Sequence, residues 1–219
     1  GKKTESGLDS NFNDVSLLLH MDGTNGSTDF VDSSTNTFSL TAESGAQIST
    51  TQVKYGTAAG YFDGSSVLKA PTGQSALSLG TGDFTVEFWV RPSGGGDQFQ
   101  QLVSWRGPAG AGDATNHGSI SWERDLSRAT WYTNTRILNS TTNSVPVDTW
   151  THVAMVRSGT ALSFYINGNF NATVNIGSQS YEYNTYGITF GSLPNIQESL
   201  IGYLDDVRIT KGVARYTGS

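Results

Sequence analysis

Apolar and polar residues alternate most strictly in the stretch FTVEFWVRP, residues 84–92. One face of this stretch carries Phe84, Val86, Phe88 and Val90, and the other carries Thr85, Glu87, Trp89 and Arg91. Period-two alternation of β-branched and aromatic residues predicts a β-strand. Pro92 ends the strand because proline cannot donate to a sheet ladder, and the glycines at 94–96 form the following turn.

Shorter segments of the same kind run along the rest of the chain. We expect strands within 15–23, 38–42, 46–50, 61–70, 98–107, 119–125, 129–135, 150–159, 161–168, 188–192 and 203–210. The dipeptide Asn167-Gly168 is the preferred sequence of a type I′ hairpin turn. No long segment has helical periodicity, so the pattern predicts an all-β sandwich or barrel.

The composition of the chain disfavours some classes of function. The 219 residues include 26 glycines and no cysteine, and the formal net charge is −6. Negative charge disfavours nucleic acid and anionic membranes as partners, and no apolar run is long enough for membrane insertion. Residues 1–13 are polar and are expected to be an N-terminal linker before one domain at 14–219. Gly1 in place of Met suggests a piece of a larger protein.

Six motifs occur in a characteristic order: SLLLHMDG, AAGYFDGSSVLKA, GTGDFTVEFWVRP, WTHVAMVRSG, FYINGN and GYLDDVRITKGVARYTG. In this order they resemble the concanavalin A-like lectin/glucanase superfamily, in its laminin-G-like or pentraxin-like branch, over about residues 15–217. The resemblance implies a jelly-roll β-sandwich of two curved antiparallel sheets, with the first and last strands side by side. The first and last motifs resemble domains of bacteriophage and marine-virus structural and tail proteins.

Catalysis by glycosidases of this superfamily requires paired carboxylates on one strand face, one as acid and one as nucleophile or base. That spacing is absent from the sequence. Glu87 stands alone on its strand, and Glu123 and Asp125 are separated only by Arg124 with no third acid following. His20 and His152 fall in predicted strands, where a structural role is the simpler interpretation. We therefore expect no enzymatic activity.

Three aspartates are candidates for binding a structural calcium ion. Asp205 shares a predicted face with the apolar Val207 and Ile209, and a carboxylate there must be paired, hydrogen-bonded or bound to a cation. Asp22 ends the first strand, which the resemblance places nearby, and oxygen ligands suit calcium. The candidate metal ligands are Asp22, Asp205 and Asp206. The alternative is that Asp22 caps its turn while the other two pair with arginines or backbone amides.

Several aromatic residues lie outside the clearest apolar faces, and one interpretation is that they bind carbohydrate. Sugars stack their C–H faces on aromatic rings and hydrogen-bond to planar polar side chains. If the Trp89 face of its strand is concave, it can form a groove with other tryptophans. The candidate ligand-binding residues are Trp89, Trp105, Trp122, Trp131, Tyr181, Tyr183 and Asn184. The alternative is that these rings close the edges of the sandwich.

Three functional hypotheses follow. The first is a non-catalytic adhesin-like module that binds a glycan or cell-surface polymer as part of a phage or microbial surface protein. The second is a virion structural or decoration domain that contacts only other virion proteins, in which a homo-oligomer is expected. The third is a divergent glycoside hydrolase. The first two place the chain in a virion or on an extracellular surface.

Overall fold

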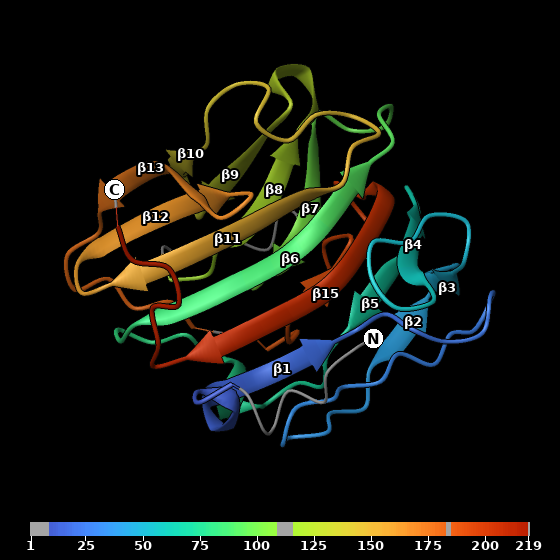
Figure 1. Cartoon of the computed structure of the whole chain (residues 1–219), viewed down its shortest axis with the longest axis horizontal. Helices are drawn as coiled ribbons and strands as arrows, with labels where there is room; N and C mark the ends of the chain where they lie inside the picture. The colour runs from blue at the N-terminus through green and yellow to red at the C-terminus, as the bar shows by residue number, and fades with distance from the viewer. Residues whose placement is uncertain (1–8, 109–115, 183–184, 219) are drawn as a thin grey trace.

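Two antiparallel β-sheets lie face to face in the computed structural model, which describes residues 9–108, 116–182 and 185–218 (Figure 1). The predicted all-β sandwich is therefore confirmed. The remaining regular structure consists of single turns of 3-10 helix, at Phe12–Asp14, Ser75–Leu77 and Arg124–Leu126. Within the described residues, no helix is long and apolar enough to cross a membrane.

The eight-stranded sheet is built around β6. Its strands, in spatial order, are β13 (Asn169–Asn175), β12 (Ala161–Ile166), β11 (Thr151–Ser158), β6 (Phe84–Pro92), β15 (Ile201–Lys211), β4 (Ala59–Asp63) and β3 (Gln47–Ser49), and β1 (Val15–Leu19) also pairs with β15. The boundaries of β6 are those that the alternation predicts. Asn167 and Gly168 both have positive φ, as a type I′ turn between β12 and β13 requires.

The seven-stranded sheet lies behind the first one in Figure 1. Its strands, in spatial order, are β10 (Arg136–Asn139), β9 (Arg128–Tyr132), β8 (Ser119–Glu123), β7 (Phe99–Ser104), β14 (Thr189–Phe190), β5 (Val67–Lys69) and β2 (Thr41–Glu43). The expected 61–70 pair exists as β4 and β5, but the turn at Asp63-Gly64 sends them to different sheets.

The ends of the chain meet in the eight-stranded sheet. β1 pairs antiparallel with β15, with Leu17 opposite Ile209 and Leu19 opposite Val207. This confirms the expected neighbourhood of the first and last strands. Residues 9–13, expected to be linker, are part of this arrangement, because the Asp9 carboxylate is 2.8 Å from Nη2 of Arg215.

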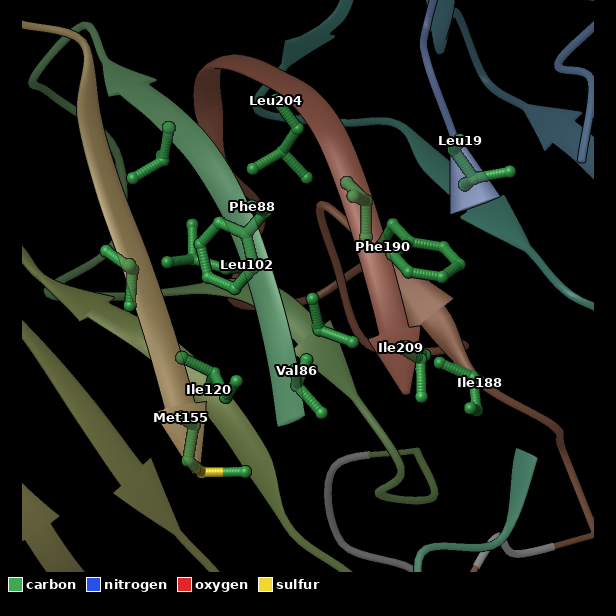
Figure 2. Packing of buried hydrophobic residues seen from close by; sticks show 14 of the residues in the cluster. Leu19, Val86, Phe88, Leu102, Ile120, Met155, Ile188, Phe190, Leu204 and Ile209 are labelled. Atoms are coloured by element: carbon green, nitrogen blue, oxygen red, sulfur yellow. The ribbon is translucent and has the colours of Figure 1, made fainter. Parts of the chain in front are cut away.

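Apolar side chains from both sheets fill the space between them. Phe88 of β6 and Leu204 of β15 lie in the same cluster as Leu102 of β7, Ile120 of β8 and Phe190 of β14 (Figure 2). The alternation in β6 is the cause, since burying one face of the strand leaves Glu87 and Trp89 on the other. The outer faces of the two sheets are thus free to carry polar sites.

Three of the predicted ligand-binding tryptophans belong to this core. Trp105, Trp122 and Trp131 are at most 1% exposed. The indole nitrogens of two of them donate to backbone carbonyls, Trp105 to Leu77 at 2.9 Å and Trp122 to Val145 at 3.0 Å. A buried ring cannot stack on a sugar, so the prediction that these three share a groove with Trp89 is wrong.

The predicted tyrosine segment is only partly described. Tyr181 is 2% exposed, and its ring lies edge-on to Trp131 at a centroid distance of 5.0 Å. It closes the sandwich, as the alternative interpretation of the aromatic residues expects, and does not offer a binding surface. Tyr183 and Asn184 lie outside the described residues.

Candidate functional site

A pocket of about 400 Å³ opens on the outer face of the eight-stranded sheet. We call it the eight-strand pocket. Its lining residues come from β1, β6, β11 and β15, the β12–β13 turn and the C-terminal segment: Leu18, His20, Glu87, Trp89, His152, Asn167, Gly168, Asp206, Arg208 and Tyr216. Cavities of several hundred Å³ with a few convergent polar groups are the usual form of a small-ligand site.

A β-bulge in β15 determines which of its side chains face the outer side of the sheet. Asp205 pairs with Trp89 and Arg208 pairs with Glu87, so two residues of β15 oppose the single residue Phe88. Asp206, with φ of 44°, is inside this bulge. The extra residue brings both Asp205 and Arg208 to the outer face. The expectation that Asp205 shares the core face of Val207 and Ile209 is therefore wrong.

Glu87 is the centre of a buried ionic cluster at one end of the pocket. Its Oε1 accepts from Nε and Nη2 of Arg208 at 2.8 and 2.7 Å. Its Oε2 accepts from the Tyr216 hydroxyl at 2.5 Å and lies 3.3 Å from Nε2 of His152. The side chain of Glu87 is 5% exposed, so its charge is compensated by partners and not by bulk water.

The cluster shifts the ionisation of its members. Burial alone would raise the pKa of Glu87, but the hydrogen bond to His152, the charge of Arg208 and the hydrogen bond from Tyr216 together lower it to about 2. Burial, the negative charge of Glu87 and the hydrogen bond to it raise the pKa of Tyr216. At neutral pH the pair is therefore a carboxylate and a neutral phenol.

The C-terminal segment lies over this face and is fixed to it. Ala214 and Tyr216 pack against the apolar patch of Ala154, Val156 and Tyr165. The Thr85 hydroxyl donates to the carbonyl of Val213 at 2.9 Å and accepts from the amide of Arg215 at 2.9 Å. The wall of the pocket formed by Tyr216 thus depends on contacts along the whole segment.

Trp89 is half-buried and contributes an aromatic ring to the wall of the pocket. Its ring centroid is 5.3 Å from that of His152 and 5.6 Å from that of Tyr55, and Nζ of Lys54 lies 3.9 Å from its ring centroid. Tyr55 is 45% exposed. Trp89 and Tyr55 together form an aromatic edge that solvent reaches, as the sequence predicted for Trp89.

The three aspartates predicted to bind calcium have other partners. Asp205 is fully buried, and its Oδ2 accepts from the amides of Lys54 and Tyr55 at 3.2 and 2.9 Å. Oδ1 of Asp22 accepts from the amide of Thr57 at 2.7 Å. Two carboxylates therefore hold the 54–58 loop, which places Tyr55 and Lys54 beside Trp89.

Asp206 is the third of these residues. Its Oδ1 is 2.7 Å from Nδ1 of His20 in the pocket wall. Across the part of the chain that the structure describes, no three His, Cys, Asp or Glu residues gather where they could hold a metal ion. Calcium binding by these aspartates remains a prediction for experiment.

Arg208, Tyr216, His152 and His20 are pocket residues that sequence reasoning did not select. The sequence favours a structural role for the two histidines because both fall within predicted strands; in the structure His20 comes directly after β1. Their position opposite Trp89 and Asp206 follows from strand pairing, with His152 directly across from Trp89. Tyr216 lies in the last motif of the resemblance, and no local pattern in the sequence indicates that it contacts Glu87.

The fold is a concanavalin A-like β-sandwich with a pocket on the outer face of one sheet. The chain belongs to the concanavalin A-like lectin/glucanases superfamily, whose family model matches residues 62–214. No protein with a curated description matches the sequence.

Several solved structures have a similar fold. The binding domain of Paraclostridial Mosquitocidal Protein 1 aligns with a TM-score of 0.68 and 17% identity, over 92% of this chain and 50% of that one. The botulinum neurotoxin serotype G binding domain gives 0.64 and 14%, over 93% and 48%. The chain thus spans about half the length of these toxin domains. Domain 4 of AbnA, a GH43 extracellular arabinanase from Geobacillus stearothermophilus, in complex with arabinotriose, gives 0.60 and 19%, over 91% and 93%.

Proposed function

We propose that this chain is a non-catalytic glycan-binding module and that the eight-strand pocket holds the sugar. One observation carries the proposal: Trp89 is half-buried in a pocket of about 400 Å³ whose other lining residues are mostly polar. An aromatic ring that is fixed on a strand and still reached by solvent offers a flat apolar surface at little entropic cost.

The polar walls supply the directional contacts that sugar hydroxyls need. Asn167 lies in the turn at one side of the pocket, and the His20–Asp206 pair lies at another. The ion pair of Glu87 and Arg208 restrains another part of the pocket lining. Rigid walls favour affinity because fewer side chains lose conformational freedom on binding.

The comparisons agree with this class of function. The structure of Domain 4 of AbnA contains arabinotriose, and the similarity to this chain extends over nearly the whole of that domain. The toxin structures are described as binding domains. These likenesses concern the fold, so the choice of sugar for this chain rests on experiment.

The acids available in the structure support a binding role over hydrolysis. Glu87, with a pKa of about 2, carries no proton to donate at neutral pH. Glu123 is buried and its Oε2 is 2.7 Å from Nε of Arg128. Asp125 pairs at the surface with Nε of Arg124 at 2.9 Å. Each candidate acid is engaged in an ion pair.

The setting of the module is part of the same proposal. We infer a virion or extracellular surface, where a recognition domain meets glycans or cell-surface polymers, and an oligomeric parent protein such as a fibre. The alternative, a virion domain that makes only protein contacts, would use the same exposed aromatic edge of Trp89 and Tyr55 as a protein interface.

The test is a glycan array on the intact protein, followed by calorimetry with the best ligand. Trp89→Ala is expected to lower affinity at least about tenfold, because a central aromatic anchor is lost. The matched control is Trp150→Ala, which removes another half-buried tryptophan that packs on Tyr203 outside the pocket and is expected to leave affinity unchanged. No array signal from the folded protein, or equal losses in both variants, would refute the assignment.

A further inference from the structure

The outer face of the seven-stranded sheet carries a second cavity, of about 260 Å³. We call it the seven-strand pocket. Its floor comes from β7, β8 and β9, at Gln101, Ser121 and Thr130, and its ends are formed by two arginine–aromatic pairs. The core separates it from the eight-strand pocket, because the two cavities lie on opposite faces of the sandwich.

Each arginine of the pocket is stacked on a ring. Cζ of Arg106 lies 4.5 Å from the ring centroid of Tyr132, and Cζ of Arg136 lies 4.6 Å from that of Phe99. Stacking fixes the plane of a guanidinium and leaves its N–H donors directed outward in that plane. A fork of donors in a fixed plane matches the two oxygens of a carboxylate.

The charges around the pocket leave an excess of positive charge. Glu198 is 3.2 Å from Nη1 of Arg106. Glu123 is 2.7 Å from Nε of Arg128 and 3.5 Å from Nη1 of Arg136. Among the described residues, three guanidinium groups therefore face two carboxylates here, in a chain of net charge −6. The more weakly held of Glu123's partners is Arg136, whose side chain is 39% exposed.

The floor is polar and already organised. The Ser121 hydroxyl donates to Oε1 of Gln101 at 3.1 Å, and Nε2 of Gln101 donates in turn to Glu198. Thr130 adds a second hydroxyl beside Ser121, its partner in the β8–β9 ladder. Hydroxyl and amide groups of this kind recognise sugar hydroxyls, whereas a bare inorganic anion would need only the arginine.

We propose that the seven-strand pocket is a second binding site, selective for a sugar that carries a carboxylate, such as a uronic acid unit. The Arg136 guanidinium holds the carboxylate, and the floor of Ser121, Gln101 and Thr130 faces the ring hydroxyls. The ligand class rests on the proposed carbohydrate function, but the site, its charge and its residues are independent of the eight-strand pocket.

The experiment is an NMR titration of the full chain with methyl β-D-glucuronide, with methyl β-D-glucoside as neutral counterpart and acetate as bare carboxylate. We expect shifts in the Arg136 side chain and in β8–β10 with the glucuronide, and about tenfold weaker binding of the other two, since each lacks half of the contacts. Binding that is equal for glucuronide and acetate would overturn the sugar assignment. Absence of shifts with glucuronide would overturn the site.

Variants separate this site from the first. Arg136→Met is expected to lower glucuronide affinity about tenfold, and Arg136→Lys to restore part of it, because the charge returns without the fork. Arg124→Gln removes a surface arginine outside the pocket and is expected to change affinity less than twofold. Trp89→Ala leaves glucuronide shifts intact if the sites are independent, so failure of one assignment does not imply failure of the other. Loss of glucuronide binding in Trp89→Ala and not in Arg136→Met would refute the seven-strand site.

Discussion

The two outer faces of the sandwich each hold one buried glutamate, and the two carboxylates take their partners from different parts of the chain. Glu87 on β6 bonds to residues 121 and 129 positions away, Arg208 and Tyr216. Glu123 on β8 bonds to residues 5 and 13 positions away, Arg128 and Arg136. Both carboxylates are compensated by arginine, but only the first closes a long loop of the chain.

The difference shows what each face depends on. The Glu87 cluster joins the central strand to the last strand and to the C-terminal segment, and Asp9 extends it to the N-terminal end through Arg208 and Arg215. The Glu123 cluster joins only neighbouring strands of one sheet. We therefore expect the eight-strand pocket to be sensitive to global stability and to both chain ends, and the seven-strand pocket to behave as a local unit.

Removal of the Glu87 side chain is expected to give the largest effect on stability in this comparison. Glu87→Ala leaves Arg208 half-buried without its main partner and removes the acceptor of Tyr216, and it is expected to lower the free energy of unfolding by about 3 kcal/mol. Glu123→Ala is expected to cost about half as much, because Glu123 has two partners, Arg128 and the partly solvated Arg136, whereas Glu87 contacts Arg208, Tyr216 and His152. Urea unfolding of both variants measures this, and equal losses would remove the distinction between the two clusters.

Acid titration gives the next largest effect. The pKa of Glu87 is about 2 in the folded chain and ordinarily 4.5, so its contribution is complete above about pH 4.5 and is lost as pH falls toward 2. The difference corresponds to about 3 kcal/mol. Wild type and Glu87→Gln should therefore converge in unfolding free energy between pH 5 and pH 2.

Comparison of wild type with Glu87→Gln isolates the contribution of the Glu87 carboxylate. Asp9, Asp63 and Glu182 also have lowered pKa values and contribute in the same direction, but they do so in both proteins. Parallel curves for the two proteins across this pH range would show that the Glu87 carboxylate does not titrate as its contacts require.

The sequence was sufficient for the parts of the fold that alternation and turn chemistry determine. The boundaries of β6 and the hairpin at Asn167-Gly168 both follow from local patterns. The burial of Trp122 also follows from the alternation, because Trp122 shares a strand face with Ile120 and both belong to the core.

The pocket depended on contacts that no local pattern encodes. The bulge at Asp206 moves Asp205 to the outer face, and period-two counting through YLDDVRI places it in the core instead. The contact between Glu87 and Tyr216 requires the path of the C-terminal segment across the sheet, which depends on many weak apolar and hydrogen-bond contacts at once. Of the predicted ligand-binding residues that the structure describes, Trp89 is the one that remains accessible.

The 54–58 loop provides the smallest and most discriminating test, because it separates a carboxylate that holds backbone amides from one that holds a metal. Asp205→Asn keeps the volume of the side chain but turns an N–H₂ group or a weaker acceptor toward the amides of Lys54 and Tyr55. We expect a loss of about 2 kcal/mol in unfolding free energy and weaker glycan binding at Trp89, since buried hydrogen bonds to a charged group are lost.

Chelation distinguishes the two accounts of this loop. If Asp22 and Asp205 act only on backbone amides, EDTA should leave the melting temperature of wild type unchanged, and added calcium should have no effect. A melting temperature that falls with EDTA and recovers with calcium would establish the predicted calcium site by mass action. That outcome would also make the position of Tyr55 beside Trp89, and with it the aromatic edge of the eight-strand pocket, dependent on a metal. The seven-strand pocket, which shares no residue with this loop, should respond to neither treatment.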